Sequence, residues 1–236
     1  QLIATLRKKI VTQLIKLKTK VTAVKEADDQ LIVQTDAGEK FKADKVILCL
    51  PPQLAGAQIK FSPELPPSLT ALLPTVQTWM AGSIKFVLEY ERPFWREKGY
   101  SGLLYSHGGV ITEMYDHTNL EANKFGFTGF LHGGAASYPK EGRQGLVLQK
   151  LKALLGPEAA QPILYEDKIW TNEFILGGQE IIYRPHQNNG HPLLQESYMH
   201  GRLFFSGTEA ATEYPGYMEG ALVSAIKTFE RMMAEG

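Results

Sequence analysis

Glycine and aromatic residues near the carboxyl end of the sequence have the composition of a ligand-binding turn. Gly201 to Glu209 has the pattern of a short apolar strand followed by a tight turn, and Tyr214 to Ala221 that of a glycine-rich helix start. A helix amino terminus presents unpaired N–H groups and a positive dipole end, which suit a phosphate or an electron-rich ring oxygen. Glycines let a planar ligand or another backbone come close. A plain strand-to-helix connection has the same spacing, so spacing alone leaves both alternatives open.

Lys85 interrupts an otherwise apolar strand pattern that runs from Ile84 to Leu88. A lysine in that position must face water or find a partner, because an unpaired buried ammonium is costly. The simpler alternative is an amphipathic strand on which Lys85 points outward.

Aromatic and histidine side chains supply further candidates. An aromatic face attracts an ammonium group, so Tyr217 could wall an amine pocket, although Tyr217 and Trp170 both also suit a hydrophobic core. His186 and His191 lie in a polar loop without the spacing of a structural zinc site, so no metal site is predicted. Glu209 has the position of an acid near a helix cap.

The first part of the chain alternates with a strand period. Residues 1–10 predict a short amphipathic helix. Asp36 to Gly38 has the composition of a hairpin turn, and Val46 to Leu50 is apolar throughout, which predicts a strand covered on both faces until Pro51 ends it. The alternation predicts strands at residues 13–18, 21–24, 31–35 and 45–50.

The remainder mixes strands with two helices. A proline-dense crossing at residues 51–74 leads to a mixed or antiparallel sheet, and residues 177–197 predict a long functional loop. We predict a mixed α/β fold in two domains, with residues 1–52 and 171–236 in one and residues 53–170 in the other. The expected strands are 79–90, 102–106, 109–115, 125–132, 163–170 and 203–206, and the expected helices are 144–155 and 216–233.

Composition narrows the classes of function. Lys+Arg and Asp+Glu number 25 each, so a net charge of +0 gives no field that would attract nucleic acid or anionic lipid. No apolar run approaches the roughly 18 residues of a membrane helix. Cys49 is the single cysteine, which excludes a disulfide framework and suggests a small buried hydrophobe. The sequence begins at Gln1 with neither an initiator Met nor a signal-peptide pattern, which is typical of an internal part of a longer protein. We expect that protein to be cytoplasmic.

Several separated motifs, taken together, resemble one family. Arg202 to Ala221 is similar to the closing flavin-binding segment of the flavin-containing amine oxidases, the monoamine and polyamine oxidases, in which a strand ending in Gly-Thr-Glu precedes Gly-Tyr-Met-Glu-Gly-Ala. The resemblance extends to Lys20–Pro52, to Gly82–Lys85 with Arg92–Trp95, and to Trp170. It implies an FAD cofactor. It also implies that residues 1–52 and 171–236 form a partial Rossmann-like FAD-binding domain and that residues 53–170 form a substrate domain.

The resemblance also assigns roles to individual positions. Val21 matches the strand residue whose backbone meets the adenine, and Cys49 falls beside the cofactor at a strand end. Lys85 matches the lysine that holds a water against the flavin N5. Tyr217 matches one wall of the aromatic cage that orients the amine. Cofactor contacts are further implied at Trp170, Gly207, Thr208, Gly216, Tyr217, Met218 and Ala221.

The activity that the resemblance implies is oxidation of a carbon–nitrogen bond by hydride transfer to flavin, with dioxygen as the acceptor and a small amine as the substrate. Family members with covalent flavin carry a cysteine after a Gly-Gly pair, whereas here Gly177-Gly178 is followed by Gln179. We therefore predict noncovalent FAD. Glu180 stands where a second cage aromatic is usual, so the second wall is either absent or built from Tyr183 or Tyr214. Gln179 and Glu180 are assigned to the substrate side, where an acid suits the second amino group of a polyamine.

One family feature is missing. No Gly-x-Gly-x-x-Gly follows a strand in this sequence, and that fingerprint places a pyrophosphate on a helix. We expect an amino-terminal half, or a partner chain, to supply it, and expect the chain alone to bind flavin weakly and to associate through an exposed apolar face, as in a homodimer. The alternatives are a desaturase or protoporphyrinogen oxidase of the same architecture, and a catalytically silent binding or assembly domain.

Overall fold

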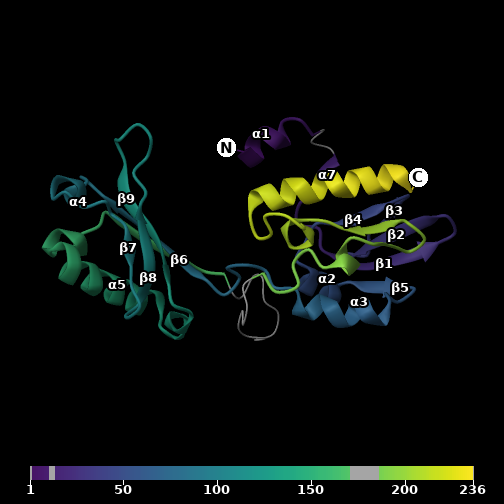
Figure 1. The fold of residues 1–236 in the computed structure, drawn as a ribbon, viewed down its shortest axis with the longest axis horizontal. Coiled ribbons are helices and arrows are strands. Elements are labelled where there is room, and N and C mark those ends of the chain that lie inside the picture. Colours follow the sequence, from purple (N-terminus) through teal and green to yellow (C-terminus); the bar gives the residue numbers. More distant parts are fainter. Residues whose placement is uncertain (1, 11–13, 171–185, 236) are drawn as a thin grey trace. The chain divides into compact units, whose positions relative to one another are not determined.

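The computed structural model describes residues 2–10, 14–170 and 186–235. The fold is mixed α/β, as predicted, and the chain divides into two compact units (Figure 1). Residues 1–78 and 184–236 form unit 1, and residues 79–183 form unit 2. Each unit is described by itself.

The first sheet of unit 1 has four strands in the order β3-β2-β1-β5. β1, β2 and β3 form an antiparallel meander, and β5 pairs in parallel with β1. Gly38 lies in the turn between β2 and β3 with φ +82°, which confirms the predicted hairpin. The bounds are Val21–Ala27 for β1, Gln30–Thr35 for β2, Lys40–Ala43 for β3 and Lys60–Ser62 for β5.

A smaller sheet of unit 1 has the order β11-β12-β4, with bounds Ser197–Tyr198, Leu203–Phe205 and Val46–Leu48. β12 is antiparallel to β11 and parallel to β4. Helix α7 (Met218–Ala234) runs along this part of unit 1 (Figure 1). The Oγ atoms of Ser206 and Ser224 are 3.3 Å apart, so α7 lies against the end of β12.

Residues 53–78 belong to unit 1, whereas the predicted boundary fell at residue 52. The physical reason is a shared core: Leu69, Leu73 and Val76 are buried in the same hydrophobic cluster as Val24 and Leu31. Among the described residues, unit 1 also contains helices α1 (Leu2–Arg7), α2 (Pro52–Gln58) and α3 (Pro67–Leu72), with short 3-10 helices at Leu73–Thr75, Pro192–Leu194 and Thr208–Ala210 (η6).

Unit 2 is a five-stranded antiparallel sheet in the order β10-β6-β9-β8-β7. Helix α5 (Lys140–Leu155) covers one face, where Val147 and Leu151 share a core with Phe86, Leu88 and Phe127. The strands are β6 (Ile84–Tyr90), β7 (Leu104–Tyr105), β8 (Ile111–Asp116), β9 (Phe125–Leu131) and β10 (Leu164–Ile169), with α4 at Phe94–Glu97 and 3-10 helices at Gly133–Ser137 and Pro157–Ala160 (η4).

Two sequence-based strand predictions were wrong in detail. No strand forms among the described residues 14–18, where Leu14 is 76% exposed, because an alternating pattern becomes a strand only when another strand pairs with it. The strand predicted from residue 79 begins at Ile84. Met80 has φ +62° and accepts a hydrogen bond from the Ser83 N–H, so a turn occupies the first residues.

Helix α7 carries its apolar side chains on the outside. Its buried positions are the small or polar Gly220, Ser224 and Thr228. At about 100° per residue, the exposed apolar positions fall within an arc of roughly 80° along the helix. This α7 apolar stripe consists of Met218, Leu222, Ile226, Phe229 and Met233, each 47% to 73% exposed. Among the described residues, α7 and the other helices lack the length and apolar character needed to cross a membrane.

Candidate cofactor and substrate site

The carboxyl ends of two parallel strands meet in unit 1. Phe205 of β12 pairs with Leu48 of β4, so Gly207 and Cys49 follow the strands at the same edge. Gly207 has φ +100°, and a Cβ there would lie 3.9 Å from the Cys49 backbone. Ligands of open α/β sheets bind outside such strand ends, and both residues are predicted cofactor positions.

Cys49 is exposed, which corrects the expectation of a buried thiol. Ile47, two residues earlier on β4, is 42% exposed, so the prediction that both faces of this strand are covered was also wrong. Partial desolvation raises the pKa of the Cys49 thiol, against a hydrogen bond with Ser206 that lowers it. Cys49 is therefore a neutral thiol at pH 7, suited to contact a ligand ring and not to act as a nucleophile.

The segment after Gly207 folds tightly onto the start of α7. Thr208 Oγ1 donates a 2.9 Å hydrogen bond to the Tyr217 carbonyl. Tyr214 and Gly216 have φ of +51° and +83°. A Cβ on Gly220 would lie 2.2 Å from the Tyr214 carbonyl oxygen, so only glycine allows this loop to touch the first turn of the helix.

The amino terminus of α7 has the donors that a flavin or phosphate oxygen needs. Tyr217 occupies the N-cap position of α7, and its side chain makes no capping hydrogen bond. The first N–H groups of α7 are therefore not capped by a side chain. The Tyr217 ring is 52% exposed and stacks on the His186 ring at a centroid distance of 6.3 Å. Met218 is exposed and Ala221 half-buried in this turn. This uncapped turn and the Gly207 turn fit the predicted FAD.

Val21 and Glu209 both belong to unit 1, but only for Glu209 does the structure show contacts that assign a role. Val21 is half-buried at the start of β1 and packs against the core, which leaves its backbone role a prediction. Glu209, expected near a helix cap, is instead only 6% exposed. Its carboxylate accepts a 2.9 Å hydrogen bond from Thr78 Oγ1, and its carbonyl accepts one from the Gly190 N–H. Glu209 therefore fixes η6 within unit 1.

Lys85 and Trp170 are neighbours at one corner of the sheet in unit 2. Lys85 is exposed on the β6 face opposite α5, and its Nζ lies 5.7 Å from the Phe130 ring centroid. The Trp170 N–H donates to the Ser83 carbonyl, two residues from Lys85 along the chain. The Nζ of Lys168 lies 5.4 Å from the Trp170 ring. The structure thus brings these two predicted residues together.

The remaining residues of interest include three that were predicted from the sequence and three that were not. Gln179, Glu180 and Tyr183 lie outside the described residues. Sequence reasoning missed Tyr105, Glu113 and Tyr115, which share the open sheet face with Lys85. Alternation could have placed each on a face, but not beside Lys85. Among the described residues, no three His, Cys, Asp or Glu side chains are grouped as metal ligands would be.

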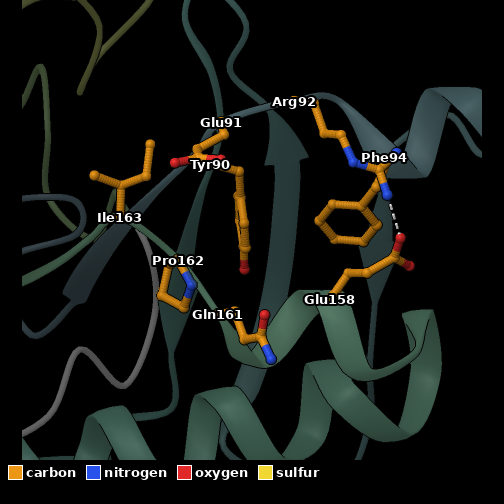
Figure 2. Close-up of a pocket in the computed structure, with 8 residues that line it drawn as sticks. All are labelled: Tyr90, Glu91, Arg92, Phe94, Glu158, Gln161, Pro162 and Ile163. Carbon is orange, nitrogen blue, oxygen red and sulfur yellow. Dashed lines mark hydrogen bonds and ion pairs between the residues drawn. The ribbon is translucent and has the colours of Figure 1, made fainter.

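A pocket of about 530 Å³ lies elsewhere in unit 2 (Figure 2). Arg92 reaches Glu158 across it, and the Tyr90 hydroxyl donates a 2.8 Å hydrogen bond to the Ala159 carbonyl. Tyr90 ends β6, five residues after Lys85 and so about 17 Å along the strand. The ion pairs of this pocket join the end of β6 to η4, which is a structural role.

A family model for flavin containing amine oxidoreductases matches residues 1–233. The chain belongs to this family. It is 32% identical over 228 residues to amine oxidase [flavin-containing] A of Canis lupus familiaris, covering 93% of this chain and 42% of that protein. In the family, solved structures of cyclohexylamine oxidase from Brevibacterium oxydans and of putrescine oxidase bound to putrescine are also similar, with TM-scores of 0.82 and 0.76, both at 26% identity.

These family members are longer than the present chain. The cyclohexylamine oxidase match covers 97% of this chain and 51% of that one, and the putrescine oxidase match covers 92% and 48%. The chain therefore spans about half the length, or less, of the family members it matches. The match confirms the resemblance of the motifs and implies a flavin cofactor.

Proposed function

We propose that this chain forms the closing part of an FAD-dependent amine oxidase, with a flavin floor in unit 1 and a substrate-binding face in unit 2. The observation that carries the proposal is the pair of parallel strand ends at Cys49 and Gly207, followed by the uncapped start of α7, in a chain that belongs to this family. The names of the relatives, among them cyclohexylamine oxidase and putrescine oxidase, support an amine substrate.

Each side chain then has a task. Bound FAD supplies the acceptor for a hydride taken from the carbon next to the amine nitrogen, with dioxygen as the final acceptor. The N–H groups at the start of α7 stabilise negative charge on the cofactor. The exposed ring of Tyr217 orients the amine, and the Lys85 ammonium holds a water and stabilises negative charge as dioxygen is reduced.

The proposal includes a second half of the fold. The α7 apolar stripe and the exposed Ile47 side chain leave apolar surface on unit 1, and the matched family members are about twice as long. We place the dinucleotide-binding segment, on the same polypeptide or on a partner chain, against this surface. Burial of the α7 apolar stripe would stabilise the joined fold by roughly 25 cal/mol for each Å² of apolar area removed from water.

Anaerobic bleaching tests the function. The chain joined to its dinucleotide-binding segment is expected to bind FAD and to lose its yellow colour when an amine is added without oxygen. Absorbance near the flavin maximum measures this, with a tertiary alcohol of the same size as the control ligand. A joined protein that retains no FAD once excess FAD has been removed by gel filtration would show a silent binding domain instead.

Lys85→Met is expected to slow reoxidation of the reduced protein by dioxygen on the order of 100-fold, because the cation that stabilises the developing negative charge is removed. Stopped-flow absorbance separates this step from reduction by the amine. Lys152→Met, on α5 at the opposite face of the sheet, is the matched control and should leave reoxidation unchanged. Equal reoxidation rates for Lys85→Met and wild type would contradict the role of Lys85.

The flavin is expected to leave the protein on acid precipitation, because Gln179 replaces the cysteine that forms a thioether in covalent members. The supernatant should contain all of the FAD, as measured by its absorbance. Colour retained in the washed pellet would show a covalent link and refute this prediction.

A further inference from the structure

The two chain segments that connect unit 1 to unit 2 are hydrogen-bonded to each other within unit 1. Residues 75–78 belong to the outgoing segment, and residues 186–190 belong to the returning segment. The Gln77 N–H donates to the Gln187 carbonyl at 3.0 Å, and Asn189 Nδ2 donates to the Gln77 carbonyl at 2.8 Å. We call residues 75–78 and 186–190 together the connection clamp.

The backbone of the connection clamp is held in one conformation by further contacts. Asn188, with φ +57°, donates from Nδ2 to Thr75 Oγ1 at 2.7 Å. Gly190 has φ +64°, and a Cβ there would lie 2.6 Å from the Ala211 carbonyl oxygen. Only glycine allows the returning segment to approach Ala211 so closely. The connection clamp therefore lies against the residues that follow η6.

Glu209 of η6 holds both segments of the connection clamp. Its Oε1 accepts a 2.9 Å hydrogen bond from Thr78 Oγ1 in the outgoing segment, and its carbonyl accepts one of 2.8 Å from the Gly190 N–H in the returning segment. Glu209 is buried. A carboxyl side chain is costly to bury, so its presence conflicts with the local packing preference, and such conflicts are typical of functional positions.

Glu209 also belongs to the candidate flavin floor. It follows Gly207 by two residues, and the Ala210 N–H donates to the Gly207 carbonyl at 3.1 Å, so η6 joins the Gly207 turn directly to Glu209. The returning segment has a second contact with this floor, because the His186 ring stacks on the Tyr217 ring. A shift of the Gly207 turn is therefore transmitted to both segments of the connection clamp.

We propose that Glu209 is a positioning residue that couples cofactor binding at the Gly207 turn to the connection clamp, and so restrains the connections of unit 2 during hydride transfer. This inference rests on the proposed amine oxidation and adds to it a residue that acts through Thr78 and Gly190. Hydride transfer needs the reacting atoms held in place, and a misplacement of about 1 Å can cost on the order of 100-fold in rate. Coupling is reciprocal, so the connection clamp should be more ordered when FAD is bound.

Hydrogen exchange of the clamp amides tests the coupling in the full-length protein. In the wild type, FAD should slow exchange of the Gln77 and Gly190 N–H groups by about 10-fold, within the usual range of coupling between two sites. In Glu209→Leu, at FAD concentrations that saturate both proteins, FAD should leave this exchange unchanged. A residue that only stabilises unit 1 would change exchange by the same factor with and without FAD. Mass spectrometry of peptides that span residues 75–78 and 186–190 measures the rates.

Flavin reduction gives a second readout. Glu209→Leu should slow reduction of the bound flavin by an amine on the order of 10- to 100-fold, because the reacting groups are held less well. Glu209→Gln keeps an oxygen that accepts from Thr78 and should restore most of the rate. Anaerobic stopped-flow absorbance measures reduction at saturating amine.

Thr78 provides the reciprocal variants. Thr78→Val removes the hydroxyl that donates to Glu209 and should reproduce both effects, whereas Thr78→Ser keeps the hydroxyl and should retain most of the wild-type rate. The double variant of Thr78→Val with Glu209→Leu should be no slower than the single variants, because the same interaction is lost in all three. If Glu209→Leu fails to fold by circular dichroism, the two Thr78 variants carry the test.

The matched control is Thr228→Val, which removes another buried hydroxyl of unit 1. Thr228 Oγ1 donates to the Phe205 carbonyl at 3.5 Å, in a part of α7 that lies about 16 Å along the helix from Tyr217. This variant should lower the stability of unit 1 and leave the response of the connection clamp to FAD unchanged.

FAD retention keeps the inference apart from the proposed function. Amine oxidation in which Glu209→Leu matches the wild type, both in FAD-dependent exchange and in the rate of flavin reduction, would overturn the positioning role and leave the function standing. Exchange at the connection clamp that does not respond to FAD in the wild type would do the same. A full-length protein that retains no FAD would overturn the proposed function and the coupling together.

Discussion

Replacing Arg143 by methionine is expected to lower the free energy of unfolding of unit 2 by about 3–5 kcal/mol, because a buried carboxylate loses its partner. The side chains of Arg143 and Asp167 are only 7% and 1% exposed. Arg143 donates to both oxygens of Asp167, at 2.9 and 2.7 Å, and to the Tyr138 carbonyl at 2.6 Å. Urea denaturation followed by tryptophan fluorescence measures the loss.

The control for this variant is Lys140→Met, which removes an exposed ion pair with Glu166 and should cost at most about 1 kcal/mol. A second substitution, Asp167→Leu, should restore much of the stability lost in Arg143→Met, since no unpaired charge then remains. Equal stabilities of Arg143→Met and Lys140→Met would contradict the assignment.

The same ion pair predicts how stability depends on pH. Burial alone would raise the pKa of the Asp167 carboxyl, but hydrogen bonds from Arg143 and Tyr165 outweigh it and hold the pKa below its usual value. A lowered folded-state pKa contributes stability that is present above the unfolded value of about 3.9 and is lost as the pH falls further. Wild-type unit 2 should therefore lose stability below about pH 4. Arg143→Met should show less of this acid dependence.

Gly220→Ala is expected to abolish retention of FAD and to destabilise unit 1 by about 1–3 kcal/mol or more. The new Cβ would lie 2.2 Å from the Tyr214 carbonyl oxygen and 2.8 Å from its carbon, and these backbone atoms must move. Tyr217, whose N–H donates to that same carbonyl and whose own carbonyl accepts from Thr208, moves with them. The FAD-to-protein ratio after gel filtration and the thermal midpoint measure both effects.

Gly145→Ala is the matched control, because it makes the same change inside helix α5 where a Cβ meets no atom within 4 Å. It should stabilise the protein by about 0.5–1 kcal/mol, as alanine loses less backbone freedom in a helix than glycine does. If Gly220→Ala binds FAD as tightly as Gly145→Ala, the loop from Tyr214 to Tyr217 does not form the flavin floor.

The sequence by itself determined the elements whose signals are local. The hairpin at Asp36–Gly38, the end of α5 before Gly156 and the passage from β12 through Gly207 to α7 each follow from nearby residues. Local rules apply there because turns, caps and helix stops are made by residues close along the chain. The family was also recognisable from the order of its motifs, which the match over residues 1–233 confirmed.

The tertiary structure decided what depends on partners distant in sequence. Strand pairing put Glu113 on the same sheet face as Lys85, and the shared core placed residues 53–78 in unit 1. The alternation around Leu14 formed no strand for the same reason, since a strand requires a neighbour that the local pattern does not specify. The exposure of Cys49 and of the α7 apolar stripe also depends on what packs against them, which hydrophobic periodicity alone does not encode.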